Sequence, residues 1–192
     1  MTIIVKYGNF YTQIKIILFL KVLCDILVIG DFMFCCFTGH RKLNTGGKLK
    51  EVLSEVIDNA IADGYTDFYC GMALGLDICA AEILISKMKK NSSLHLHAAL
   101  PCPKQDLKWT DEEKSIYEEI LSFASTKTII SPFYTKTCML TRNRFMVDNS
   151  ERVIAVWNGS HRGGTAYTVR YAKSQNKEIH LIRPKDLSVD II

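Results

Sequence analysis

Two patterns of apolar residues alternate along the chain from Met33 onward. Short apolar runs are typical of buried strands, whereas apolar residues at helical spacing are typical of helices with one buried face. The pattern predicts strands at 33–37, 66–71, 94–100, 126–131, 152–157 and 178–182. It predicts helices at 47–64, 74–90, 111–124, 140–150 and 164–176.

This alternation of strands and helices predicts an α/β fold, because parallel strands need helical crossovers that cover both faces of the sheet. The crossovers are right-handed, which gives a three-layer Rossmann-like domain with a mostly parallel sheet of about six strands. We expect residues 33–192 to form this single domain. Ligands of such domains bind outside the carboxyl ends of the strands, so the loops that follow the strands become the candidate site.

Residues 1–32 lack this alternation. They are apolar without a clear period, and Lys21 and Asp25 interrupt the long uncharged run that a membrane span needs. We interpret them as an N-terminal extension outside the fold. Gly30-Asp31 can be encoded by a purine-rich stretch like a bacterial ribosome-binding site, so we hypothesise that the natural protein starts at Met33. The alternative is a membrane anchor or a partner-binding helix.

The composition indicates a globular protein of a reducing compartment. Of the 192 residues, 48% are hydrophobic and 23% are charged, which fits one domain with a real core. The seven cysteines are odd in number and no CxxC pair occurs, so we expect a cytoplasmic location without a disulfide framework. The net charge of +4 is too small to indicate a nucleic-acid binder by itself.

The loops after the predicted strands are rich in glycine, amide, hydroxyl and basic side chains. Glycine-rich turns at Gly71–Gly75 and Gly163–Thr165 run into helices, where backbone N–H groups and the helix dipole favour an anion. We therefore expect a ligand with a phosphate group at this edge. The candidate ligand-binding residues are Thr38, Gly39, His40, Arg41, Gly71, Met72, Ala73, Gly75, Asp77, Gln105, Trp109, Arg142, Asn143, Asp148, Gly163, Gly164 and Thr165.

Four of these side chains have specific expected roles. Arg41 and Arg142 supply forked donors that fit phosphate oxygens, so we expect them to hold one phosphate group from either side. Asp77 is expected to accept a hydrogen bond from a ribose hydroxyl, and Trp109 is expected to stack on a base. The simpler alternatives are a solvated surface charge for Arg142, a helix cap for Asp77 and a packing role for Trp109. For the glycines, the simpler alternative is a role in tight turns.

The stretch Cys35–His40 resembles a metal site only at first sight. Cys35 and Cys36 are neighbours on a predicted strand, so their side chains point to opposite faces of the sheet. His95 and His97 alternate on another strand and are expected to face one side. No metal spacing is present, and we expect neither a metal nor a cofactor.

Five segments that run in order through nearly all of 33–182 resemble the SLOG superfamily of Rossmann-like proteins, and more narrowly its YpsA/YoqJ-like branch of bacterial and phage proteins. The matching segments are CCFTGHR (35–41), CGMALGLDICAAE (70–82), LPCPKQDLKW (100–109), LTRNRFMVDNSERVIAVWNG (140–159) and GGTAYTVRYA (163–172). The resemblance implies a nucleotide or a nucleotide-derived small molecule at the strand ends, and a homodimer is a further expectation.

Two better-understood relatives of this branch imply rival functions. The DNA-processing protein DprA, which binds single-stranded DNA, has turns that resemble Gly39–Arg41, Gly71–Asp77 and Gly164–Thr168. The LOG phosphoribohydrolases carry a catalytic glutamate on the helix after their Gly-Gly turn, yet Thr165–Lys177 contains neither Asp nor Glu. We therefore expect a sensor or regulatory module that binds a nucleotide. The alternatives are an N-glycosidic hydrolase and a single-stranded DNA binder.

Overall fold

A seven-stranded sheet runs through the residues that the computed structural model describes, 33–43 and 47–192. The strand order is β4-β3-β2-β1-β5-β6-β7, and only β7 is antiparallel to its neighbour. The strands are β1 (Met33–Gly39), β2 (Tyr65–Cys70), β3 (His95–Leu100), β4 (Thr126–Ile129), β5 (Arg152–Val156), β6 (Glu178–Ile182) and β7 (Val189–Ile191). The hypotheses about residues 1–32 lie outside the described residues.

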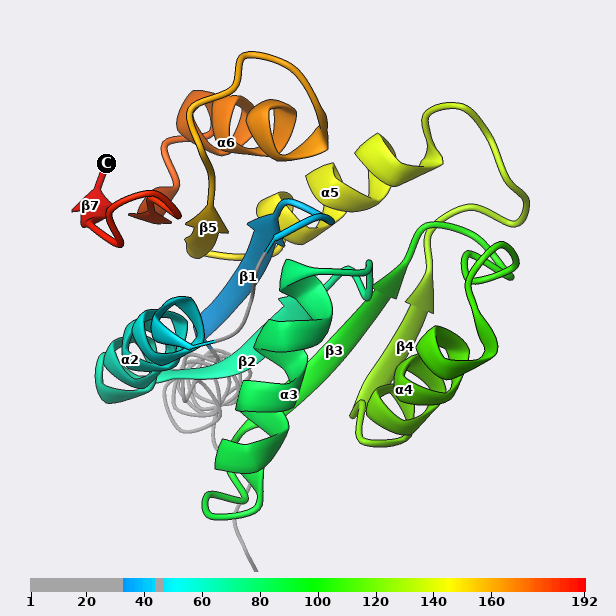
Figure 1. The fold of residues 1–192 in the computed structure, drawn as a ribbon, viewed down its shortest axis with the longest axis horizontal. Helices are drawn as coiled ribbons and strands as arrows, with labels where there is room; N and C mark the ends of the chain where they lie inside the picture. Colours follow the sequence, from blue (N-terminus) through cyan, green and yellow to red (C-terminus); the bar gives the residue numbers. More distant parts are fainter. Residues whose placement is uncertain (1–32, 44–46) are drawn as a thin grey trace, which may run out of the picture. The chain divides into compact units, whose positions relative to one another are not determined.

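Helices cover both faces of the sheet and complete the three layers (Figure 1). One face packs against α2 (Lys48–Ala62), α3 (Leu76–Met88) and α4 (Asp111–Ser122). The other face packs against α5 (Cys138–Asp148) and α6 (Gly164–Ser174). The predicted three-layer Rossmann-like fold is confirmed, and the sheet has one strand more than the six predicted.

The first strand shows how the alternation of side chains builds both halves of the core. Cys35 and Phe37 pack among the apolar residues under α2 and α3, whereas Cys36 packs under α5 and α6. Burial raises the pKa of Cys35 well above its ordinary value and raises that of Cys36 to about 12. Thiols with such pKa values stay protonated at neutral pH, so these two cysteines act as small core residues.

The strand order creates a topological switch point between β1 and β5. The chain leaves β1 toward α2 on one face and leaves β5 toward α6 on the other face. The loops after these two strands therefore diverge and leave a crevice outside their carboxyl ends, which is where ligands of open α/β sheets bind. Among the described helices, none is both long and apolar enough to cross a membrane.

Candidate functional site

A cavity of about 370 Å³ lies at the carboxyl end of β1, within this crevice. Its walls come from the end of β1, the turn after β2, helix α5 and the first turn of α6. The cavity brings together ten of the predicted site residues: Thr38, Gly39, His40, Arg41, Ala73, Asp77, Arg142, Asn143, Gly164 and Thr165. Its volume lies at the small end of the range of ligand pockets, roughly 300–1,000 Å³.

Arg142 is the central charge of this cavity. Its side chain is only 5% exposed, and its Nη1 atom lies 3.6 Å from the Oδ2 atom of Asp77. The Nε and Nη1 atoms are buried and make no hydrogen bond to the protein. Burial lowers the pKa of the guanidinium, and the Asp77 carboxylate opposes this effect. The alternative of a solvated surface charge is therefore wrong, and the cavity contains a cation with unused donors.

Asp77 contacts both the turn after β2 and the guanidinium of Arg142. Its Oδ2 atom accepts a hydrogen bond from the backbone N–H of Ala73 at 3.2 Å. Burial raises the pKa of this carboxyl, while Arg142 and the Ala73 N–H oppose the increase. The buried carboxylate thus orients Arg142 and neutralises only part of its charge.

The glycines after β2 serve close packing. A Cβ atom on Gly71 would overlap the Nη1 and Cζ atoms of Arg142, so glycine leaves the space that the guanidinium occupies. Gly75 has a positive φ of 85°, and a Cβ atom there would lie 2.6 Å from the carbonyl oxygen of His40. The N–H groups of Ala73 and Leu76 already have protein partners. This turn therefore supports Arg142, and two of its backbone N–H groups are already used within the protein.

The first turn of α6 retains the properties of an anion site. Gly163 precedes the helix with a φ of 101°, and no side chain caps this end. Gly164 and Thr165 line the cavity, so the first-turn N–H groups and the helix dipole act at its wall. Asn143 donates from Nδ2 to Thr168 Oγ1 at 2.7 Å, which fixes α5 against α6 beside the cavity.

His40 and Lys136 complete the polar wall. The backbone N–H of Asn158 donates to His40 Nε2 at 3.2 Å, so His40 ties the end of β1 to the loop after β5. Lys136 precedes α5 and lines the cavity, although no sequence pattern marked it. Together with Arg41 and Arg142, it gives the lining three cations against the single carboxylate of Asp77. The sequence also missed the apolar lining residues Phe37, Met139, Leu140 and Met146.

Several predicted residues support the site from outside the cavity lining. Gln105 donates from Nε2 to the carbonyl oxygen of Met72 at 2.9 Å, and Met72 is fully buried with a φ of 55°. Trp109 packs edge-on against Tyr117 of α4, with ring centroids 5.3 Å apart. The packing alternative for Trp109 thus describes its environment, and the expected base-stacking role has no geometric support.

Asp148 also lies outside the cavity lining. It ends α5 and accepts a hydrogen bond from the hydroxyl of Tyr171 on α6 at 2.7 Å. This placement gives Asp148 a role in joining the two helices. Within 33–43 and 47–192, no group of three or more His, Cys, Asp or Glu side chains is arranged to hold a metal ion.

The fold and the crevice define the class of protein: a Rossmann-like α/β module with a polar cavity at the switch point of its sheet. A family model described as the YspA SLOG family matches residues 33–187, and the chain belongs to this YpsA family. The resemblance inferred from the five sequence segments is therefore confirmed.

Curated relatives and a solved structure agree with this assignment. The SPbeta prophage-derived protein YoqJ of Bacillus subtilis is 30% identical over 139 residues, covering 66% of this chain and 81% of YoqJ. A UPF0398 protein of Bacillus pumilus is 23% identical over 128 residues, covering 66% of this chain and 69% of that protein. The crystal structure of DNA processing protein A (DprA) from Streptococcus pneumoniae matches with a TM-score of 0.57 and 17% identity. It covers 79% of this chain and 50% of the DprA chain, and the likeness shows the fold alone.

Proposed function

We propose that this cavity binds the phosphate group of a nucleotide or nucleotide-derived small molecule, and that the protein acts as a sensor or regulatory module. The observation that carries this proposal is the buried guanidinium of Arg142, which lines the cavity and whose Nε and Nη1 atoms make no hydrogen bond to the protein. Arg142 lines the cavity, and its buried positive charge, which faces a single carboxylate at 3.6 Å, favours an anion there through charge-assisted interactions. The uncapped first turn of α6 supplies further donors on the same wall.

The charge of the cavity favours a terminal phosphate over an internal phosphodiester. Arg41, Lys136 and Arg142 carry three positive charges, and Asp77 carries one negative charge when it is ionised. The lining thus presents a net charge of about +2, which matches a phosphate monoester dianion. A phosphodiester carries one negative charge, so it would leave the cavity with an excess cation. A nucleoside monophosphate is therefore the best fit to the chemistry of the lining.

An exposed aromatic pair is available for the base. Phe133 and Tyr134 are 67% and 70% exposed, and they lie on the loop between β4 and α5 that also carries Lys136. Tyr134 lies two residues before Lys136, which lines the cavity. Two residues of extended chain span at most about 7 Å, so the backbone of Tyr134 lies within that distance of the backbone of Lys136. Aromatic rings stack on bases without strong sequence preference. We assign the stacking role expected of Trp109 to this pair.

One observation favours a second candidate function, the N-glycosidic hydrolase. Asp77 is the carboxylate among the cavity-lining residues, and burial raises its pKa, as is common for acids in active sites. Glycosidic hydrolysis requires such a group near the scissile bond. The ion pair with Arg142 argues against this role, because it fixes the carboxylate at the wall.

Isothermal titration calorimetry with nucleoside 5′-monophosphates and inorganic phosphate tests the proposal. We expect Arg142→Met to weaken binding by roughly 10- to 150-fold, the loss of a charged hydrogen bond of about 1.5–3 kcal/mol. Arg144→Met is the matched control, because Arg144 lies on the same helix but stacks over Tyr167 and is absent from the cavity lining. If neither ligand binds the unmodified protein, or if both variants lose affinity equally, the proposed site is wrong.

The same panel separates the two alternatives. If the protein releases free base from a nucleoside monophosphate and Asp77→Asn abolishes this release, the protein is a hydrolase and the sensor proposal is wrong. Affinity that increases with oligonucleotide length and falls steeply with salt would favour a single-stranded DNA binder.

A further inference from the structure

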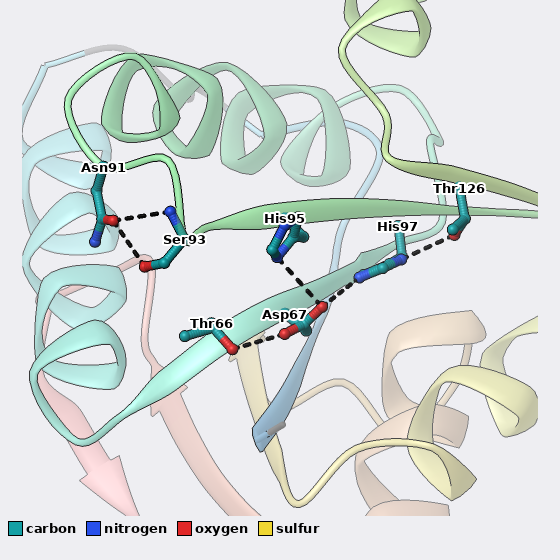
Figure 2. A network of polar contacts seen from close by, with 7 residues as sticks. All are labelled: Thr66, Asp67, Asn91, Ser93, His95, His97 and Thr126. Atoms are coloured by element: carbon teal, nitrogen blue, oxygen red, sulfur yellow. Dashed lines mark hydrogen bonds and ion pairs between the residues drawn. The ribbon is translucent and has the colours of Figure 1, made fainter. Parts of the chain in front are cut away.

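A second polar cluster lies on the sheet itself, away from the cavity (Figure 2). Asp67 on β2, His97 on β3 and Thr126 on β4 form its centre. The register pairs His97 with Thr126 across the two strands, and Asp67 with His95. These side chains point to the α5–α6 face, because Phe68, the neighbour of Asp67, packs into the opposite half of the core.

The cluster forms a continuous hydrogen-bonded relay. The Oδ1 atom of Asp67 lies 2.7 Å from His97 Nε2, and His97 Nδ1 lies 2.8 Å from Thr126 Oγ1. A carboxylate only accepts hydrogen bonds, so the Nε2 atom carries the proton that it donates to Asp67. In the neutral imidazole the Nδ1 atom is then an acceptor, and the Thr126 hydroxyl donates to it. Each hydrogen bond thus has a defined direction.

The burial of the three groups follows the order of the relay. Asp67 is buried, and its second oxygen accepts from the hydroxyl of Thr66 at 2.6 Å. The side chain of His97 is 12% exposed, whereas Thr126 is exposed at the first position of β4. The residue that bears the hydroxyl is therefore exposed to solvent, while the carboxylate behind it is buried. An acid, a base and a hydroxyl in this order are the parts of an activated nucleophile.

We propose that Thr126 is a nucleophile toward activated acyl groups, with His97 as its general base and Asp67 as the positioning residue. The Thr126 Oγ attacks the carbonyl carbon of an ester and transfers its proton to His97 Nδ1. The imidazolium returns this proton to the leaving alcohol as the ester C–O bond breaks, which leaves an acyl-threonine. Water, deprotonated by the same imidazole, then releases the acid and restores the hydroxyl.

The surroundings favour a neutral acyl substrate over a phosphoryl group. The Asp67 carboxylate repels anions, and the rings of Phe34 and Tyr69 lie beside His97 with centroids 5.6 and 5.3 Å away. The described sheet ends at β4, so Thr126 lies on its edge strand.

Hydrolysis of p-nitrophenyl acetate by the full chain, combined with peptide mass mapping after reaction with a fluorophosphonate probe, tests the assignment. We expect the probe mass on Thr126, and we expect Thr126→Val to lower turnover by roughly 10²–10⁴-fold, the contribution of general base catalysis. Thr126→Ser should retain turnover. Thr128→Val is the matched control, because Thr128 lies two residues along the same face of β4 and pairs with Ala99. Equal rates in the two valine variants would overturn the proposal.

The positioning role of Asp67 needs a readout that stability alone does not change. In Asp67→Asn the amide can donate to Nε2, which places the imidazole proton on Nδ1 and removes the acceptor for Thr126. We expect kcat to fall by roughly 10²–10⁴-fold with KM unchanged and the circular dichroism spectrum preserved. Unchanged kcat in the folded variant would refute the relay. If Asp67→Asn does not fold, the turnover of Thr126→Val tests the relay, because the exposed side chain of Thr126 contributes little to the core.

Discussion

Gly71→Ala isolates the part of the proposed phosphate site that depends on the position of Arg142. Gly71 has no positive φ, so alanine is compatible with its backbone conformation. The added Cβ atom would overlap the guanidinium of Arg142 and lie 2.8 Å from Asp77 Oδ2. The end of an arginine side chain is flexible, so we expect the guanidinium to move out of its position while the backbone is retained.

The size of the effect differs between stability and binding. Overpacking in a core costs about 1–3 kcal/mol, and we expect the lower value because the displaced group is the end of a long side chain. Displacement removes the charged donors from the cavity, which costs about 1.5–3 kcal/mol of binding free energy, or roughly 10- to 150-fold in Kd. A single methyl group that contacts no ligand should thus reproduce most of the effect of Arg142→Met.

Calorimetric titration with a nucleoside monophosphate and denaturant unfolding measure the two quantities separately. Gly159→Ala is the control, because a Cβ atom there meets nothing within 4 Å, although its φ of 83° adds some strain. We expect the control to lose stability without losing affinity. Full affinity in a folded Gly71→Ala variant would refute the conclusion that the buried guanidinium of Arg142 binds the phosphate.

Three further predictions follow from the same site. Tyr134→Ala should weaken binding of a nucleoside monophosphate but not of ribose 5-phosphate, since the sugar phosphate has no base to stack; equal effects in calorimetry would remove Tyr134 from the site. Burial raises the pKa of Asp77 from its ordinary value of 3.8, so the native state binds this proton more tightly than the unfolded chain does. Lowering the pH from above the raised pKa toward 3.8 should therefore stabilise the native protein relative to an Asp77→Asn variant. Urea unfolding at stepwise pH values measures this difference in stability. A difference that decreases on acidification would show that burial does not dominate the pKa of Asp77. The double variant Arg142→Met with Asp77→Asn should have an unchanged or higher melting temperature, because a buried ion pair contributes little net stability. The increase in melting temperature with added phosphate should disappear in this variant, and a retained increase would mean that the anion binds elsewhere.

The fold was predictable because its strands and helices differ clearly in apolar spacing. The parallel strands other than β4 are short, mostly buried runs, and α4 begins with an acidic turn and a capping box between Thr110 and Glu113. β7 was not predictable, because it has three residues, its central residue is Asp190, and its pairing depends on the neighbouring β6. Antiparallel addition at a sheet edge leaves little trace in the sequence of so short a strand.

The edge of the sheet that holds the candidate site was also predictable, but the role of each residue was not. Loop composition located Arg142 and Asp77 near one another, because both follow strands whose carboxyl ends share that edge. Whether an arginine on a helix faces solvent or a cavity depends on the packing of α5 against β1, which local spacing does not encode. The same limit applies to Lys136, because a lysine in a polar loop has no distinguishing pattern.

The environment of Arg142 connects the stability of the protein to the proposed binding. A guanidinium buried beside one carboxylate, with no hydrogen bond from Nε or Nη1 to the protein, loses hydration that the protein only partly replaces. A glycine at position 71 is required to accommodate it, at the expense of backbone entropy. Such an arrangement lowers the stability of the ligand-free protein, and an anion bound in the cavity would offset part of the buried positive charge. The sites where a sequence departs from the best local packing are expected to be functional sites, which is why this cavity carries the proposed function.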